Sequence, residues 1–218
     1  MRSDSDPDLS QAADHPPGAG ARRVGLLALQ GDYEAHARAL AEIGVRTRTV
    51  TRAAHLDEVD SLLLPGGEST TIAKLIEAYD LAPALERFRR SGRPLFGTCA
   101  GLILLASEVV GYPDQPRLGF LDVGVDRNAY GRQVESFETE LDAPALGTQP
   151  LPAVFIRAPR LARIGPQVEV LARLDGEAVL VRQGSILGAT FHPELTADRR
   201  VHRLFLGMGQ ARAEADAA

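Results

Sequence analysis

The chain has 218 residues, of which 44% are hydrophobic and 24% are charged, and its net charge is −5 at pH 7. This length and composition are typical of one or two globular units with a sizeable core, and the acidic balance disfavours nucleic-acid binding, which needs a basic surface. The single cysteine, Cys99, excludes an intramolecular disulfide and a zinc site built from several thiolates. No apolar run is long enough to span a membrane or to act as a secretory signal. We therefore expect a cytoplasmic protein without a membrane or nucleic-acid partner, and no metal or organic cofactor is indicated.

The ends of the chain differ from its body in composition. Residues 1–21 are rich in Ser, Asp, Pro and Gly and hold scarcely any large apolar side chains, so burial cannot offset the entropy lost on ordering them. We expect a disordered tail over residues 1–21, one folded domain over residues 22–209 and a frayed C-terminus over residues 210–218.

The first half of the folded part alternates between strand-like and helix-like patterns. Short apolar or alternating runs, typical of strands, stand at residues 24–29, 45–50, 61–64 and 94–97. Apolar residues at helical spacing mark residues 32–43, 69–78, 82–90 and 100–110. This alternation predicts an α/β fold with a parallel sheet covered on both faces, and it places ligands at the carboxyl ends of the strands.

The second half has the pattern of antiparallel hairpins. Strands are predicted at residues 121–125, 134–141, 153–156, 168–174, 178–182 and 185–191, with a last helix at residues 198–207. Short turns such as Asp175-Gly176 and Gln183-Gly184 join several of them. We expect an antiparallel portion added to the mostly parallel central sheet.

Cys99 stands between Gly97 and Gly101, directly after an apolar strand and before a helical run. This pattern is typical of a nucleophile elbow, in which small residues two positions to either side permit a sharp turn from strand to helix. The thiol then lies at a helix N-terminus, where the helix dipole favours the reactive thiolate. The alternative is a buried structural cysteine. Because that alternative does not require the two glycines, we interpret Cys99 as a nucleophile.

A nucleophile of this kind needs a base, and His192-Pro193-Glu194 follows a predicted strand. In an extended chain residues two apart project to one side, and the proline favours extended backbone at His192. Glu194 is therefore able to orient the imidazole, as in a nucleophile-His-acid triad. The remaining histidines are interpreted as incidental: His15, His36, His55 and His202.

Consecutive glycines, Gly66 and Gly67, follow the third predicted strand and open a helix. Exposed backbone N–H groups in such a loop can stabilise the oxyanion that forms when a carbonyl is attacked. A phosphate cradle is the rival interpretation, but the G-x-x-x-x-G-K-[ST] pattern is absent. A plain glycine turn that caps the helix is compatible with either.

These segments resemble the class I glutamine amidotransferase family and, within it, the glutaminase subunits of pyridoxal phosphate synthase. The resemblance covers roughly residues 23–208, and six motifs in the family's order are jointly specific. They are LQGDYEAH (29–36), LPGGESTT (64–71), FGTCAGLILLA (96–106), RNAYGRQVESFE (127–138), VFIRAP (154–159) and FHPELT (191–196). The family implies a three-layer, flavodoxin-like α/β fold and hydrolysis of L-glutamine to L-glutamate and ammonia.

The resemblance also implies a role for individual residues. Cys99 corresponds to the nucleophile, with His192 and Glu194 as its relay pair, and the hypothesis places the oxyanion on the N–H groups of Gly67 and Ala100. The predicted substrate-binding residues are Gly67, Glu68, Ser69, Arg127, Ile156 and Arg157. The residues predicted to contact a partner and switch the oxyanion loop are Gln30 and Gly66. For Arg127 and Arg157 a surface ion pair is the alternative.

A partner follows from the resemblance as well. A chain of this length is filled by the glutaminase, so the ammonia is expected to pass to a separate barrel-shaped synthase subunit. The family implies twelve glutaminase chains on a synthase dodecamer. Alternatives are another class I glutaminase subunit, a stand-alone cysteine hydrolase of γ-glutamyl compounds and a non-catalytic interaction module.

Overall fold

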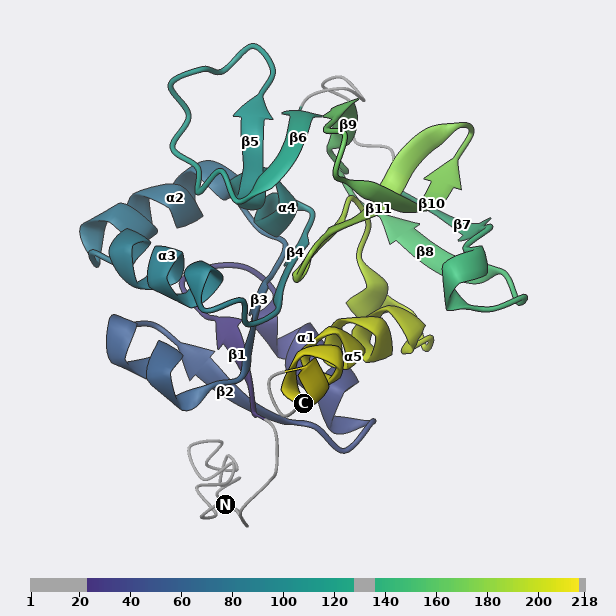
Figure 1. Ribbon diagram of the computed structural model, residues 1–218. Helices are drawn as coiled ribbons and strands as arrows, with labels where there is room; N and C mark the ends of the chain where they lie inside the picture. The colour runs from purple at the N-terminus through teal and green to yellow at the C-terminus, as the bar shows by residue number, and fades with distance from the viewer. Residues whose placement is uncertain (1–22, 128–135, 216–218) are drawn as a thin grey trace, which may run out of the picture.

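The computed structural model describes residues 23–127 and 136–215, and for the side chains residues 23–127 and 136–208 (Figure 1). The expected tail over residues 1–21 lies outside the described residues. The helices are α1 (Tyr33–Ala41), α2 (Ser69–Ala78), α3 (Ala82–Arg90), α4 (Ala100–Leu105) and α5 (Arg200–Ala215), with short 3-10 turns η2 (Ala53–Glu58), η3 (Pro144–Leu146) and η4 (Pro193–Leu195). No helix within the described ranges has the length and apolar character needed to cross a bilayer.

A central sheet carries the fold. Its strands lie in the order β10-β11-β12-β4-β3-β1-β2, and the run from β12 to β2 is parallel throughout, whereas β10, β11 and β12 pair antiparallel. Their bounds are β1 (Arg23–Leu27), β2 (Arg46–Val50), β3 (Ser61–Leu64), β4 (Leu95–Thr98), β10 (Glu169–Leu174), β11 (Glu177–Gln183) and β12 (Ile186–Ala189). The α/β fold with a mostly parallel sheet and an antiparallel portion is thus confirmed.

Helices cover both faces of this sheet, which gives three layers (Figure 1). Successive residues of a strand face opposite sides, and on β3 Leu62 and Leu64 join one apolar cluster while Leu63 joins the other. The first cluster packs α2, α3 and α4 against the sheet. The second packs α1 and α5 against the other face and takes in Phe96 of β4.

Smaller sheets extend the second half of the chain. One holds β5 (Ala106–Val109), β6 (Leu121–Asp126) and β9 (Arg160–Ile164), and the other holds β7 (Phe137–Leu141) and β8 (Leu151–Phe155). The predicted strands at residues 121–125, 134–141 and 153–156 thus pair in these two smaller sheets, beside the antiparallel strands β10 and β11 that extend the central sheet. Strand β9 was not predicted, because only its antiparallel pairing with β6 makes it a strand.

The predicted helix over residues 100–110 was wrong in its second half. Helix α4 ends at Leu105, Ala106 is extended with ψ 146°, and the chain continues as β5 beside β6. A short apolar run does not by itself distinguish a helix from a strand. Pairing with a strand later in the chain decides the conformation here.

Helix α5 runs from Arg200 to Ala215, whereas the sequence predicted residues 198–207. The added residues 208–215 have the sequence MGQARAEA, in which alanine and long unbranched side chains favour a helix. The predicted end of the helix was wrong. The expectation that residues 210–218 fray, and the division into tail, domain and C-terminus, stay predictions.

Two glycines allow the close approach of α4 to the sheet. A methyl group on Gly101 would overlap the backbone oxygen of Leu64, and one on Gly97 would lie 2.6 Å from the carbonyl carbon of Gly101. Neither backbone contact is able to relax by moving a side chain. The elbow at Cys99 therefore depends on hydrogen atoms at these two positions.

Gly101→Ala should separate α4 from β3. We expect the free energy of unfolding to fall by about 1–3 kcal/mol, as for other overpacked cores, measured by urea denaturation. Gly207→Ala is the matched control, because Gly207 is helical and a methyl group there meets no atom within 4 Å. The control should be neutral or stabilising by up to about 1 kcal/mol. Equal stability of Gly101→Ala and the native chain would contradict the close-packing argument.

Candidate active site

Cys99 occupies a sharp turn between β4 and α4. Its φ of +47° and ψ of −104° lie outside helical and extended backbone, a conformation that a non-glycine residue adopts only when its surroundings impose it. The Cys99 N–H donates to the carbonyl of Ala189 at 2.9 Å, which ties the turn to the end of β12. The side chain is buried but reaches the surface at 8% relative exposure.

His192 and Glu194 lie just beyond the carboxyl end of β12, the strand next to β4. The His192 Nδ1 and Glu194 Oε1 atoms are 2.8 Å apart, and the Glu194 side chain is 1% exposed. The backbone N–H of His192 donates to Val154 of β8 at 2.8 Å. Parallel pairing of β12 with β4 thus brings the predicted relay pair to the same sheet edge as Cys99.

Gly66 shows how closely these groups approach each other. A methyl group at Gly66 would lie 2.5 Å from Cε1 of His192 and 3.6 Å from Cβ of Cys99. The imidazole, the cysteine and the glycine loop therefore meet at one point. Only glycine fits between them.

The charge state of His192 depends on both neighbours. Burial is the largest influence and lowers the pKa of the imidazole, but the Cys99 side chain and the Glu194 carboxylate together outweigh it and raise the pKa to about 10. The buried Nε2 atom has no hydrogen-bond partner among the described residues, and the influence of Cys99 on the ring is therefore read as electrostatic. This pairing favours the charged imidazolium form of His192.

The Gly66–Gly67 peptide is held by the loop that follows β1. The carbonyl of Gly66 accepts from the N–H of Asp32 at 3.3 Å, and Oε1 of Gln30 accepts from the N–H of Glu68 at 2.7 Å. No cis peptide occurs among the described residues, and in a trans peptide the N–H points opposite to the carbonyl. The N–H of Gly67 therefore points away from the Asp32 loop. The two residues predicted to act as the switch, Gln30 and Gly66, both lie where this loop contacts the glycine loop.

Ala100 is the first residue of α4. The first N–H groups of a helix have no partner within it, so the Ala100 N–H is available beside the thiol. Its role as an oxyanion donor stays a prediction.

Two predicted substrate residues contact each other. Arg127 lies 3.7 Å from Oε1 of Glu68, which is the ion pair that was the alternative interpretation, and it also donates to Thr70 at 3.1 Å. Gln115, which the sequence did not single out, accepts from Arg127 and donates to the buried Ser69 at 3.2 Å. A hollow of about 370 Å³ opens here, lined by Thr70, Gly111, Tyr112, Pro113, Asp114, Gln115, Pro116 and Arg127.

Ile156 and Arg157 follow β8 at the rim of the cysteine. The carbonyl oxygen of Ile156 lies 4.0 Å from the Cys99 sulfur. Arg157 has φ of +44° and an exposed side chain. The structure thus brings this segment to the thiol, while the Arg157 side chain forms no ion pair with a described residue.

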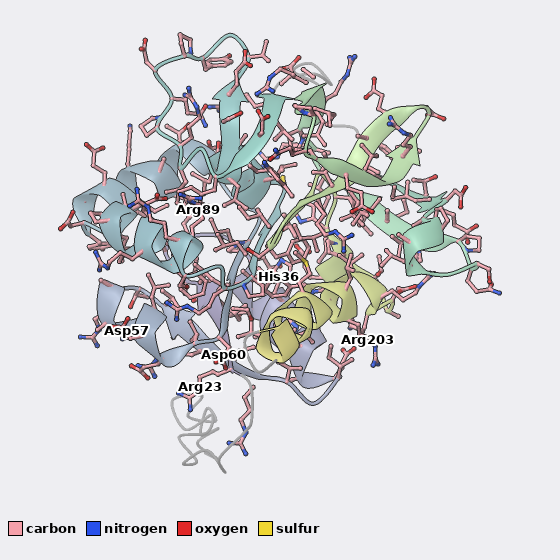
Figure 2. The ribbon with its side chains drawn as sticks, in the orientation of Figure 1. Arg23, His36, Asp57, Asp60, Arg89 and Arg203 are labelled. Atoms are coloured by element: carbon pink, nitrogen blue, oxygen red, sulfur yellow. The ribbon has the colours of Figure 1, made fainter. Side chains whose placement is uncertain are left out.

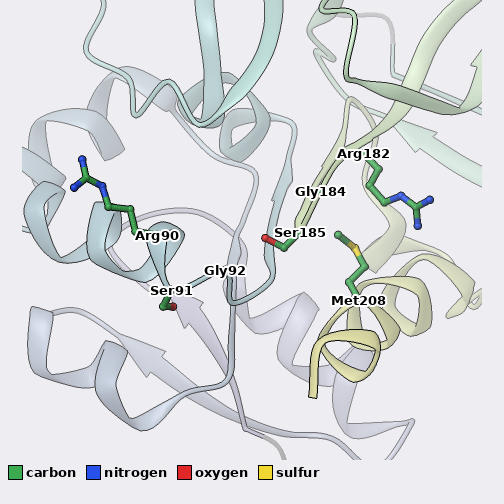
Figure 3. Close-up of a pocket in the computed structure, with 7 residues that line it drawn as sticks. All are labelled: Arg90, Ser91, Gly92, Arg182, Gly184, Ser185 and Met208. Atoms are coloured by element: carbon green, nitrogen blue, oxygen red, sulfur yellow. The ribbon is translucent and has the colours of Figure 1, made fainter. Parts of the chain in front are cut away.

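A second hollow lies at the opposite end of the sheet (Figure 3). It measures about 570 Å³ and is lined by Arg90, Ser91, Gly92, Arg182, Gly184, Ser185 and Met208. Six of these residues precede β4 or β12 along the chain and Met208 belongs to α5, whereas the cysteine and histidine follow directly after those two strands. Because the hollow and the cysteine lie at opposite ends of these strands, the two sites are separate. The arginines of the hollow, Arg90 and Arg182, are paired with Glu86 and Glu169.

The sequence missed the groups that lie behind Glu194. His36 and His202 were interpreted as incidental, yet both are fully buried and His36 lies 3.3 Å from Oε2 of Glu194. A helical spacing that points His36 into the sheet was the available signal. Nothing in the sequence indicated that it meets His202, which is far away along the chain.

Comparison with known proteins gives one consistent family. A model of the SNO glutamine amidotransferase family matches residues 26–210. Relatives from Frankia alni and Thermus thermophilus, both named "Pyridoxal 5'-phosphate synthase subunit PdxT", are each 55% identical over 84% of this chain and over 93% and 95% of their own.

Solved structures agree with this result. A crystal structure of a glutamine amidotransferase is 52% identical, covers 86% of this chain and 98% of its own, and superposes with a TM-score of 0.82. The structure of PurLQS from Thermotoga maritima is 16% identical, covers 86% of this chain and 98% of its own, and has a TM-score of 0.69. The second likeness shows the fold alone.

Glu194→Gln removes a charge that raises the pKa of His192. We expect that pKa to fall from about 10, measured by NMR titration of the ring. A folded-state pKa above the ordinary value of 6.5 stabilises the fold fully below about pH 6.5, and this stabilisation is lost as pH rises through about 10. In Glu194→Gln this stabilisation should be lost at a lower pH than in the native chain, because the pKa of His192 is lower.

Glu169→Gln is the matched control, because Glu169 is paired with Arg182 on the surface. It should leave the titration of His192 unchanged. An equal pKa in the native chain and Glu194→Gln would contradict the assigned cause.

Proposed function

This chain belongs to the SNO glutamine amidotransferase family, and on that basis we propose that it is the glutaminase subunit of a pyridoxal 5'-phosphate synthase. It hydrolyses L-glutamine to L-glutamate and ammonia. The observation that carries the proposal is the meeting of Cys99 with an imidazole whose other nitrogen lies 2.8 Å from a buried carboxylate. That arrangement supplies a nucleophile, a proton carrier and an orienting group.

In the first half of the reaction the Cys99 thiolate attacks the carboxamide carbon of glutamine. The carbonyl electron pair moves to oxygen, and the N–H groups of Gly67 and Ala100 stabilise the oxyanion. When the tetrahedral intermediate collapses, the C–N bond breaks and the His192 imidazolium gives its proton to the departing nitrogen. Ammonia leaves and a glutamyl thioester remains on Cys99.

In the second half neutral His192 removes a proton from water, which attacks the thioester carbon. Collapse of this second intermediate breaks the C–S bond and returns the thiolate beside the imidazolium. Glu194 holds the ring tautomer and stabilises its charge in both halves. The balance is one glutamine and one water consumed for one glutamate and one ammonia.

Glutamine is recognised through its ammonium and carboxylate. Glu68 and Arg127 carry the complementary charges, and their 3.7 Å ion pair keeps both side chains at the loop. Arg127 takes the carboxylate and Glu68 the ammonium. Gly67, Ser69 and the Ile156–Arg157 segment complete the enclosure of the substrate.

The ammonia passes to a barrel-shaped synthase subunit on another chain. Support comes from the relatives, which are named as subunits of pyridoxal 5'-phosphate synthase. Docking acts through Gln30, because its side chain holds the loop that contains the Gly66–Gly67 peptide. Assembly of twelve copies on a synthase dodecamer, and a cytoplasmic location, stay predictions.

Rival functions differ in where ammonia goes. Another class I glutaminase subunit would respond to a different acceptor, and a stand-alone γ-glutamyl hydrolase would work without a partner. Ammonia release from glutamine, measured with and without the synthase subunit, separates these from the proposed function. A non-catalytic module would release none in either condition.

Cys99→Ala should abolish hydrolysis. We expect the rate in the presence of the synthase subunit to fall at least about a thousandfold, as when other nucleophiles of this type are removed, measured as ammonia released. Circular dichroism and the melting temperature should be close to native, since the thiol makes no directed hydrogen bond with a described residue except the long contact to Ile156. Native-level hydrolysis in this variant would refute the mechanism.

Activation should depend on Gln30. The isolated chain is expected to be nearly inert toward glutamine, with added synthase raising the rate, and Gln30→Ala should reduce that increase about tenfold through loss of the loop contact. Gln183→Ala is the matched control, because Oε1 of Gln183 also accepts a backbone N–H, from Asp122 at 2.8 Å, away from the cysteine. Equal activation in the two variants would count against the role of Gln30.

A further inference from the structure

A second histidine, His36, lies directly behind the proposed triad. It projects from α1, is completely buried and lies inside the molecule beside α5 (Figure 2). Its ring packs edge-on against Phe96 and His202, with ring centroids 6.4 and 5.4 Å apart. Such a polar ring in an apolar core persists only when its nitrogens have partners.

The polar contacts form a continuous chain. His36 Nδ1 lies 3.1 Å from Nε2 of His202, and His36 Nε2 lies 3.2 Å from the Thr98 hydroxyl and 3.3 Å from Oε2 of Glu194. The other carboxylate oxygen of Glu194 is the one 2.8 Å from His192. Both oxygens of the buried carboxylate therefore face an imidazole nitrogen.

Both inner histidines are neutral. Burial, followed by the nearby His202 and His192, lowers the pKa of His36 well below its ordinary value. Burial and Arg199 lower the pKa of His202 to about 4. Each ring then carries one N–H and one bare nitrogen.

The surroundings determine which nitrogen carries hydrogen. His202 Nδ1 is buried without a hydrogen-bond partner among the described residues, and an orphaned N–H is the rarer and costlier case, so the hydrogen of His202 is on Nε2. It donates to Nδ1 of His36. The hydrogen of His36 is then on Nε2, where it forms the hydrogen bond with the Thr98 hydroxyl. Oε2 of Glu194 lies 3.3 Å from the same nitrogen and has no hydrogen-bond partner among the described residues, so the N–H attracts this oxygen electrostatically, whereas a bare nitrogen would repel it.

We propose that His36 is a positioning residue for the triad, whose Nε2–H lies 3.3 Å from Oε2 of Glu194 and holds the carboxylate against His192 by electrostatic attraction. This inference rests on the proposed function. His202 and Thr98 hold the His36 ring in turn. His36 touches neither substrate nor thiol, and it acts only through Glu194.

A neutral imidazole suits this task. Lysine or arginine at the same place would hold the carboxylate but would also cancel its charge, and that charge is what favours the imidazolium form of His192. A hydrophobic residue would leave Oε2 buried without any polar contact. Histidine supplies an N–H without a net charge.

Helix α1 also links the two halves of the site. The backbone N–H of its N-cap, Asp32, donates to the carbonyl of Gly66, and His36 lies one turn later. Residues four apart share a helix face. The same rigid element therefore contacts the oxyanion loop and the acid of the triad.

The test compares two amides at position 36 in the full chain. Glutamine places its NH₂ group near the position of Nε2 of the His36 ring, and asparagine places it near that of Nδ1. Both side chains are polar and would be buried at the same site. We expect His36→Gln to keep kcat for glutamine within about threefold in the presence of the synthase subunit. His36→Asn should lose about ten- to a hundredfold in kcat, the usual effect of removing a group that orients a functional histidine, with KM within about twofold.

A second readout needs neither glutamine nor partner. Alkylation of Cys99 by iodoacetamide, followed against pH in the isolated full chain, reports the thiolate beside its imidazolium. The midpoint of the curve should be native in His36→Gln and higher by about one pH unit in His36→Asn. His55→Gln is the control, because His55 is also largely buried and its ring nitrogens form hydrogen bonds with Thr51 and Arg52, away from the cysteine. Both kcat and the alkylation curve of this variant should equal those of the native chain.

The outcomes separate the two proposals. Identical kcat and identical alkylation curves in the two amide variants, with native melting temperatures, would overturn the role of His36. No ammonia from the native chain with the synthase, together with the expected difference in alkylation, would refute the proposed function while keeping the positioning role. If His36→Asn does not fold, His202→Asn takes its place, because asparagine leaves no donor at the position of Nε2 of His202, which donates to Nδ1 of His36, and it should move both readouts in the same direction by a smaller amount.

Discussion

The turn at Cys99 is the constraint on which the rest of the site depends. A cysteine with φ of +47° is not stable by local preference, so the surrounding structure must impose it. It does so by close packing at Gly97 and Gly101 and by the hydrogen bond from Cys99 to Ala189. The packing of the core thus offsets the unfavourable backbone conformation of Cys99. It holds the sulfur at the point where α4 begins and the strands β4 and β12 end.

The order of strands in the sheet supplies the partner of that sulfur. Because β12 lies beside β4 and parallel to it, the residues that follow both strands meet at one edge. His192 and Cys99, distant along the chain, become neighbours without a long loop to carry either. The glycine loop after β3 joins them because β3 is the other neighbour of β4, and this explains why three separate motifs converge.

Electrostatics then divides the buried histidines into two kinds. His192 is beside a carboxylate and a cysteine, which outweigh burial and favour its charged form. His36 and His202 are buried against Phe96 and each other, and they are kept neutral. One residue type thus serves as proton carrier at the surface of the site and as neutral hydrogen-bond donor behind it, and environment alone sets the difference.

The sequence by itself determined the α/β class, the elbow with its flanking glycines, and the His-Pro-Glu pair, because each is a local pattern whose backbone requirement is read from adjacent residues. Pairing between distant segments decided the rest. The strand at Ala106–Val109 exists only because β6 lies beside it, Gln115 reaches Ser69 and Arg127 only across the fold, and His36 meets His202 and Glu194 only when α1, α5 and the sheet pack together. Such contacts depend on the relative positions of whole elements, and no local spacing along the chain encodes them.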